Sequence, residues 1–233
     1  MTSESAFTDT CIGALAPGHT GSCQTLQRAQ LTRALLAASI VYVIGFYFIG
    51  AAVKPAYSQL SSFVSEYNAT GTPWAGTLTY AGFAATTGLL AGFLIAAAPV
   101  IQVSGASRAG FWLLWSLPFS FLIGAVAPCD AGCPLEGSTS QLLHNALAIP
   151  AYFGMGVSVV LLSLAPGLYS YKYRRSFMLL TGLAFPVVFL AMVQPEFSPW
   201  RGLLQRSLDI GMAVSLVMAT WTLIPANAAA SRR

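Results

Sequence analysis

Charged residues are scarce in this chain. Only 8% of its 233 residues are Asp, Glu, Lys or Arg, whereas 56% are hydrophobic, and soluble domains are about 25% charged. This number of charges is too small to cover the surface of a soluble fold. The composition therefore indicates a membrane protein. Because a helix crosses the hydrocarbon core with about 20 apolar residues, the chain has room for six such helices with short loops, but not for a sizeable soluble domain.

Several functional signals are missing as well. The sequence has no cluster of Lys and Arg on a soluble face, which argues against nucleic-acid binding. It contains only 2 His and 4 Cys, too few for a multiple-histidine metal site, and we expect neither a metal nor a cofactor. Residues 1–30 are polar and lack the basic start and apolar core of a signal peptide. The middles of the hydrophobic runs are nearly free of ionisable groups, which argues against a proton-coupled pump.

Six hydrophobic runs predict an all-α, polytopic membrane protein with six transmembrane helices. We expect these helices at residues 34–53, 74–101, 110–127, 142–165, 176–193 and 203–224. Residues 1–33 are then a flexible cytoplasmic tail, 34–225 the six-helix domain and 226–233 a short cytoplasmic tail. Pro118, Pro150 and Pro186 fall inside three runs and should kink those helices. Gly88 and Gly92 form a small-xxx-small pair that favours close helix contact.

The distribution of Lys and Arg predicts the orientation in the membrane. Eight of the 11 basic residues lie in the tails and in the two loops that contain Arg108 and Arg174. Only Lys54, Arg201 and Arg206 lie on the other side. Because basic loops stay in the cytoplasm, we expect both termini inside and the loops 54–73, 128–141 and 194–202 outside. The high Ala and Gly content is typical of a bacterial chain, so we expect the bacterial plasma membrane.

Polar side chains gather at the predicted outer side. His144 is the only histidine outside the N-terminal tail and lies at the start of the fourth span. Arg206 and Asp209 are three residues apart on the sixth span, so they share a helix face. Burying them in a membrane costs free energy unless they pair or face a polar cavity. Arg206 paired with Asp209 or Glu66 is the structural interpretation, and a binding site is the functional one.

Cys129 and Cys133 flank Asp130 in one of the predicted outer loops. An oxidising compartment favours a disulfide between these cysteines, which would fix Asp130 in place. A metal site that uses both thiols and His144 is the alternative, but it has too few ligands. Cys11 and Cys23 lie on the predicted reducing side, where we expect free thiols.

Three segments of the chain carry a family resemblance. They are Ser61-Ser62-Phe63-Val64-Ser65-Glu66 before the second span, the stretch from Pro128 to Pro134 with the following Leu143-His144, and Gly202-Leu203-Leu204-Gln205-Arg206 at the start of the sixth span. Together they resemble the DUF998 family of six-pass membrane proteins. The Pro-Cys-Asp-x-Gly-Cys-Pro stretch is the most specific part. The resemblance covers about residues 34–224. It implies the six-pass topology and the site residues Ser61, Asp130, His144, Gln205 and Arg206, but no reaction.

Three functions remain open on these grounds. The first is binding or handling of a lipid or another amphiphilic ligand, with membrane lipids as partners. In this case the polar head would be held by Glu66, Gln205, Arg206 and Asp209, because Arg pairs well with phosphate and carboxylate groups.

The second function is a membrane-embedded hydrolase or transferase. Ser61 or a neighbouring serine would be the nucleophile, His144 the base, and Asp130 or Glu66 the group that orients the base. A Gly-x-Ser-x-Gly motif is absent from the sequence. The third function is structural or partner-binding, with the polar residues tying the helices together.

Overall fold

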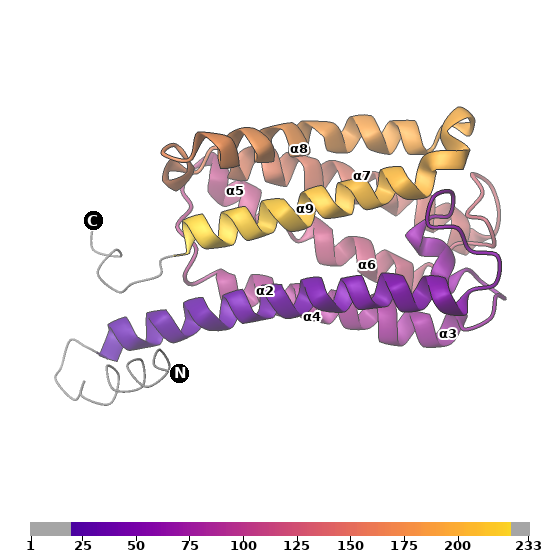
Figure 1. The fold of residues 1–233 in the computed structure, drawn as a ribbon, viewed down its shortest axis with the longest axis horizontal. Helices are drawn as coiled ribbons and strands as arrows, with labels where there is room; N and C mark the ends of the chain where they lie inside the picture. Colours follow the sequence, from indigo (N-terminus) through magenta and orange to yellow (C-terminus); the bar gives the residue numbers. More distant parts are fainter. Residues whose placement is uncertain (1–19, 225–233) are drawn as a thin grey trace.

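The computed structural model describes residues 20–224 as a bundle of long helices (Figure 1). The α-helices are α2 (Thr20–Val53), α3 (Ala75–Leu78), α4 (Ala85–Ala97), α5 (Ala106–Leu113), α6 (Ser116–Val126), α7 (Thr139–Leu162), α8 (Lys172–Met192) and α9 (Arg201–Leu223). Short 3-10 turns are η1 (Val64–Asn68), η3 (Pro166–Leu168) and η4 (Pro195–Trp200), and a π-helical turn η2 (Thr79–Ala84) joins α3 to α4. Within residues 20–224, 6 helical stretches are long and apolar enough to cross a membrane. The predicted all-α fold with six spanning helices is confirmed.

The six stretches lie close to the predicted positions, except that the first and the sixth begin earlier than expected. They are Gln24–Val53, Ala75–Ala97, Ala106–Val126, Thr139–Leu162, Lys172–Met192 and Pro195–Leu223. Helix α2 already begins at Thr20, well before the expected residue 34, because residues 24–33 are mostly Gln, Leu, Arg and Ala, which favour a helix without being apolar throughout. Residues 1–19 and 225–233 and the side chain of Cys23 lie outside the described part, so the predicted free thiols lie there too.

Both ends of the described chain lie at one end of the bundle (Figure 1). There, Arg33 Nη2 donates a hydrogen bond to the carbonyl of Ile224 at 2.8 Å. At the opposite end, which we call the distal end, the loops 54–74, 127–138 and 193–200 come together. The Thr70 amide donates to the Cys129 carbonyl at 2.8 Å, and the Leu203 amide donates to the Leu60 carbonyl at 3.0 Å. Segments far apart in sequence therefore build one surface.

Of the three prolines, Pro118 is the one that interrupts its helix. Proline has no N–H to donate to the carbonyl four residues earlier, which here is Leu114. The third span accordingly separates into α5 and α6, and the Leu117 amide donates to the Leu114 carbonyl instead, at 2.9 Å. Pro150 and Pro186 lie inside α7 and α8, and both helices continue past them.

Close helix contacts occur at glycines other than the predicted pair. A Cβ atom added to Gly88 or Gly92 would meet no atom within 4 Å, so the predicted close contact at these residues is wrong. Helices α7 and α8 instead meet at Gly156 and Gly182, where a Cβ on Gly182 would lie 2.7 Å from the Gly156 carbonyl oxygen. Backbone-to-backbone approach of this kind is how membrane helices pack without a hydrophobic driving force.

Candidate functional site at the distal end

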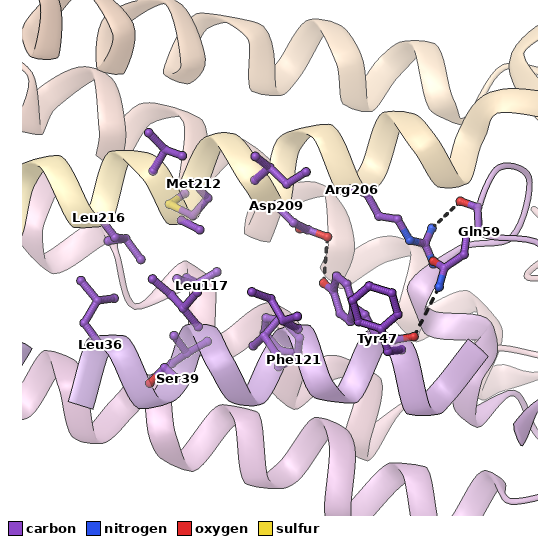
Figure 2. Close-up of a pocket in the computed structure, with 18 residues that line it drawn as sticks. Leu36, Ser39, Tyr47, Gln59, Leu117, Phe121, Arg206, Asp209, Met212 and Leu216 are labelled. Carbon is purple, nitrogen blue, oxygen red and sulfur yellow. Dashed lines mark hydrogen bonds between the residues drawn. The ribbon is translucent and has the colours of Figure 1, made fainter. Parts of the chain in front are cut away.

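Arg206 fastens the loop 54–74 to helix α9. The side chain starts about one turn inside α9 and reaches towards the loop. Its Nη1 atom donates to the carbonyl oxygen of Gln59 at 2.9 Å (Figure 2). The same atom donates to the carbonyl oxygens of Ser62 at 3.2 Å and Gly202 at 2.9 Å. Its Nη2 atom donates to the hydroxyl oxygens of Tyr57 at 2.5 Å and Tyr67 at 3.2 Å. The guanidinium group is thus held by neutral oxygen atoms.

The charge of Arg206 has no carboxylate against it. Among residues 20–224, the one ion pair that involves a Lys or Arg side chain joins Arg201 Nη2 to Glu66 Oε1 at 3.1 Å. Arg206 therefore pairs with neither Asp209 nor Glu66. Its Nε atom is buried without a hydrogen-bond partner. Burial raises the pKa of the Tyr57 hydroxyl above its ordinary value, so this neighbour stays neutral. The distal end therefore contains a partly buried positive charge without a directly bound counter-ion.

Asp209 and Gln205 connect α9 to the rest of the bundle. Asp209 Oδ2 accepts a hydrogen bond from the Tyr47 hydroxyl of α2 at 2.8 Å (Figure 2). Gln205 Oε1 accepts from the Val64 amide at 2.7 Å, and its Nε2 donates to the Tyr152 hydroxyl of α7 at 2.8 Å. The polar face of α9 thus bonds with two other helices and one loop.

His144, half-buried near the start of α7, has one ring nitrogen engaged and one available. Its Nδ1 lies 2.8 Å from the carbonyl oxygen of Ala127. A carbonyl can only accept, so Nδ1 carries the proton and Nε2 of the neutral ring has a lone pair. In the described part of the chain, Nε2 has no hydrogen-bond partner.

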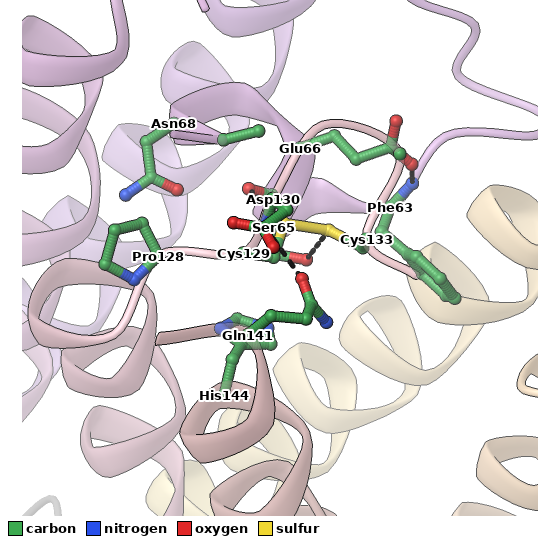
Figure 3. Close-up of a disulfide and its surroundings, with 12 residues drawn as sticks. Phe63, Ser65, Glu66, Asn68, Pro128, Cys129, Asp130, Cys133, Gln141 and His144 are labelled. Carbon is green, nitrogen blue, oxygen red and sulfur yellow. Dashed lines mark hydrogen bonds between the residues drawn. A yellow bond between two sulfur atoms is a disulfide. The ribbon is translucent and has the colours of Figure 1, made fainter. Parts of the chain in front are cut away.

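A disulfide joins Cys129 and Cys133 beside His144 (Figure 3). Asp130 lies between them, but its carboxylate accepts hydrogen bonds from the amide and hydroxyl of Ser138, both at 2.8 Å. The Asp130 amide donates to Gln141 Oε1 at 2.7 Å. Asp130 thus fixes the loop that leads into α7 and does not hydrogen-bond with the imidazole of His144.

Three cavities meet among these side chains. The α2–α9 groove has a volume of about 430 Å³, the α7–α8 pocket about 480 Å³, and a small chamber between them about 60 Å³. Tyr47, Phe121 and Asp209 line both the groove and the chamber. His144 and Tyr152 are among the residues that line both the chamber and the pocket. The chamber therefore shares lining residues with both larger cavities.

The sequence pattern of the family described as "Protein of unknown function (DUF998)" matches residues 36–222. The chain belongs to this family. The match includes all six membrane-spanning stretches apart from the first residues of α2 and the last residue of α9, and the predicted resemblance is confirmed. No curated protein and no solved structure matches the chain.

In this DUF998 protein, the predicted site residues fall into two groups. Gln205 and Asp209 line the chamber together with His144, and Arg206 lines the groove. The second group lines none of the three cavities and consists of Ser61, Glu66 and Asp130.

The predicted hydrogen-bonded set of Ser61, His144 and Asp130 is not formed. The Ser61 carbonyl accepts from Arg201 Nε at 2.8 Å. Of the neighbouring serines, Ser65 lines the chamber together with His144, but its hydroxyl lies 3.2 Å from the sulfur of Cys133. The catalytic roles of these residues stay a prediction.

The sequence analysis missed the tyrosines of the site. Tyr47, Tyr57, Tyr67 and Tyr152 surround Arg206, Gln205 and Asp209 and supply hydroxyl groups to all three. A search for ionisable residues overlooks them because tyrosine counts as apolar. What could have identified two of these tyrosines is their position within membrane spans. Tyr47 lies two turns from the end of the first span, and Tyr152 lies inside the fourth.

Proposed function

We propose that this DUF998 protein binds a single-chain amphiphile. The apolar chain lies in the α2–α9 groove, and the polar head lies beside Arg206 and Asp209. The observation that supports this best is the shape and lining of the groove. It is long and mostly apolar, and polar side chains line only its distal end. Its apolar wall includes Leu36, Ile40, Leu90, Leu117, Met212 and Leu216.

The shape of the groove suits one extended hydrocarbon chain. Between Leu36 and Phe48 it follows α2 for about 18 Å at 1.5 Å per residue. Its rim contains side chains that face the surroundings of the bundle: Ile44 is 51% exposed, Phe48 70% and Ile210 65%. Because these helices are long and apolar enough to cross a membrane, such a rim borders lipid. An acyl or isoprenoid chain can enter from the side without crossing a polar surface.

The polar end of the groove favours an amphiphile over a purely apolar molecule. Tyr47, Gln59, Arg206 and Asp209 line the groove only near the distal end. Ionisable groups inside a membrane mark functional sites because burying them is costly. The Arg206 guanidinium group attracts a polar head, and the Asp209 carboxylate lies one helix turn deeper.

The proposal includes the orientation in the membrane. The distal end faces outside and both termini face the cytoplasm of a bacterial cell. The excess of Lys and Arg at the terminal side supports this orientation, as does the disulfide at the distal end, since disulfides persist in oxidising compartments. The amphiphile then comes from the outer leaflet.

Two valines on α2 provide a test with a matched control. Val43 lines the groove, whereas Val41 lies two residues away and is 69% exposed outside it. Val43→Trp should fill the groove, and Val41→Trp should add the same indole on the lipid-facing side. Wild type, both variants and a host lipid extract would be combined in detergent, and native mass spectrometry would detect bound species.

We expect wild type and Val41→Trp to retain a single-chain amphiphile, and Val43→Trp to lose it by tenfold or more. A bound species that survives Val43→Trp unchanged would refute the groove as the binding site. If wild type retains no bound species even when the detergent is saturated with lipid extract, the proposed binding function is refuted.

A second candidate function is a hydrolase or transferase that acts on the same amphiphile. The observation that favours it is the unpartnered Nε2 of His144, which is available as a base beside the chamber. If this function is correct, wild type converts a bound lipid into a product and His144→Ala binds that lipid unchanged. If the lipid is unchanged on both proteins, the enzymatic function is refuted and only the binding function remains.

A further inference from the structure

Three residues that line the chamber have polar atoms whose hydrogen-bonding capacity is not used up. His144 Nε2 has a lone pair without a donor, as described above. Asp209 accepts one hydrogen bond, from Tyr47, and its other carboxylate oxygen has no partner in the described chain. The Tyr152 hydroxyl accepts from Gln205, but within residues 20–224 its own proton has no acceptor. Two acceptors and one donor thus remain.

The other hydroxyl groups that line the chamber are engaged. Ser120 donates to the Leu117 carbonyl at 2.7 Å, and the Ser65 hydroxyl lies against the Cys133 sulfur at 3.2 Å. The remaining lining includes Val64, Phe83, Phe121, Ile123, Ala148 and Met155. The hydrogen-bonding character of the chamber is therefore set by His144, Tyr152 and Asp209.

Given the proposed function, we infer that the bound amphiphile carries a hydroxyl group, which enters the chamber. The hydroxyl donates to Asp209 and accepts from Tyr152. A hydroxyl has the donor and acceptor that this set of atoms requires. Asp209 lines both cavities, so a chain in the groove brings its polar end to the chamber entrance.

The volume of the chamber is sufficient for this group. A water molecule needs roughly 10–15 Å³ of such volume, so about 60 Å³ accepts a hydroxymethyl group.

The charges nearby favour a neutral group. Arg206 and Asp209 carry opposite charges one helix turn apart, so their local sum is zero. An ionic head inside the chamber would add a charge that no described residue balances, and an unbalanced charge in an apolar surrounding is costly. A hydroxyl group fulfils the hydrogen bonds without this cost.

The test compares tetradecanol with tetradecyl methyl ether, in which a methyl group replaces the hydrogen that the alcohol donates. Each would be titrated against the full chain in detergent, with native mass spectrometry as the readout. The proteins are wild type, Asp209→Leu, which removes both carboxylate oxygens, and Val43→Trp. Thermal unfolding of each protein checks that it is folded. The comparison of the two probes on wild type needs no variant at all.

We expect wild type to bind the alcohol at least tenfold more tightly than the ether, and Asp209→Leu to bind the two within about twofold. Equal binding of alcohol and ether to wild type, with both lost in Val43→Trp, would overturn the hydroxyl inference and leave the groove as the binding site. Failure of both probes to bind wild type would overturn both this inference and the proposed function. A preference for the alcohol that persists in Asp209→Leu would exclude Asp209 as the acceptor and overturn the inference as stated.

Discussion

Replacing Arg206 by Met should destabilise the protein far more than replacing Arg201 by Met. Arg206 donates five hydrogen bonds that hold the loop 54–74 on α9. Met keeps the unbranched apolar part of the side chain but leaves those oxygen atoms without their donor. Each hydrogen bond from a charged group contributes about 1.5–3 kcal/mol, but the sum is offset by the cost of burying the guanidinium group and its unpartnered Nε. Leaving a buried acceptor without a donor costs about 1–3 kcal/mol, so we expect a net loss of about 3 kcal/mol.

Arg201 is the matched control because it also lies in the first turns of α9. Its ion pair with Glu66 is partly exposed, with side-chain exposures of 24% and 15%, and pairs of this kind contribute about 0–1 kcal/mol. For a chain of this size, about 3 kcal/mol corresponds to a loss of about 10 °C in Tm. Thermal unfolding of the purified variants in detergent measures the difference. Equal Tm losses for Arg206→Met and Arg201→Met would refute the role of Arg206 as the main fastening of the loop.

Three further predictions concern packing, the disulfide and one lysine. Gly202→Ala should lower the free energy of unfolding because the added Cβ would lie 2.5 Å from the Ser62 carbonyl oxygen. Gly88→Ala should raise the free energy of unfolding by up to about 1 kcal/mol, because the added Cβ meets no atom and alanine favours a helix. Equal effects of the two substitutions in thermal unfolding would contradict both predictions. Reducing the disulfide should cost only about 2 kcal/mol, because the cysteines are 4 residues apart and close a short loop; unfolding on mild reduction would contradict this. Burial lowers the pKa of Lys54 below its ordinary 10.5. The charged form is therefore disfavoured in the folded state, so stability should rise as pH increases from the folded-state pKa towards 10.5, and this rise should vanish in Lys54→Met.

The fold could be predicted because the membrane imposes simple rules on the sequence. A span must be long, apolar and helical, since no water is present to bond the backbone, so hydropathy located four spans closely, together with the ends of the first and the sixth. The start of the first span was placed too late because residues 24–33 favour a helix without being apolar throughout, and hydropathy does not detect them. The disulfide between Cys129 and Cys133 followed from the expected oxidising compartment.

The contacts within the site could not be predicted in the same way. The bond between Tyr47 and Asp209 joins residues 162 positions apart, and it depends on how α2 and α9 pack. Asp130 illustrates the opposite problem, because its carboxylate bonds with the nearby Ser138. A short loop closes more readily than a long one, so a polar residue in a loop often bonds locally. Sequence identified which residues were unusual, but not which of them meet.

The unequal lengths of the helices determine how the bundle fits a bilayer. Helix α8 has 21 residues and is about 32 Å long, close to the hydrocarbon thickness of about 30 Å. Helix α2 has 34 residues, about 51 Å, and its start projects beyond the other helices (Figure 1). Arg206 and the loop 54–74 hold the other end of α2 at the distal end. A thicker bilayer therefore draws in more of the free end of α2, and the groove entrance keeps its depth relative to the distal surface.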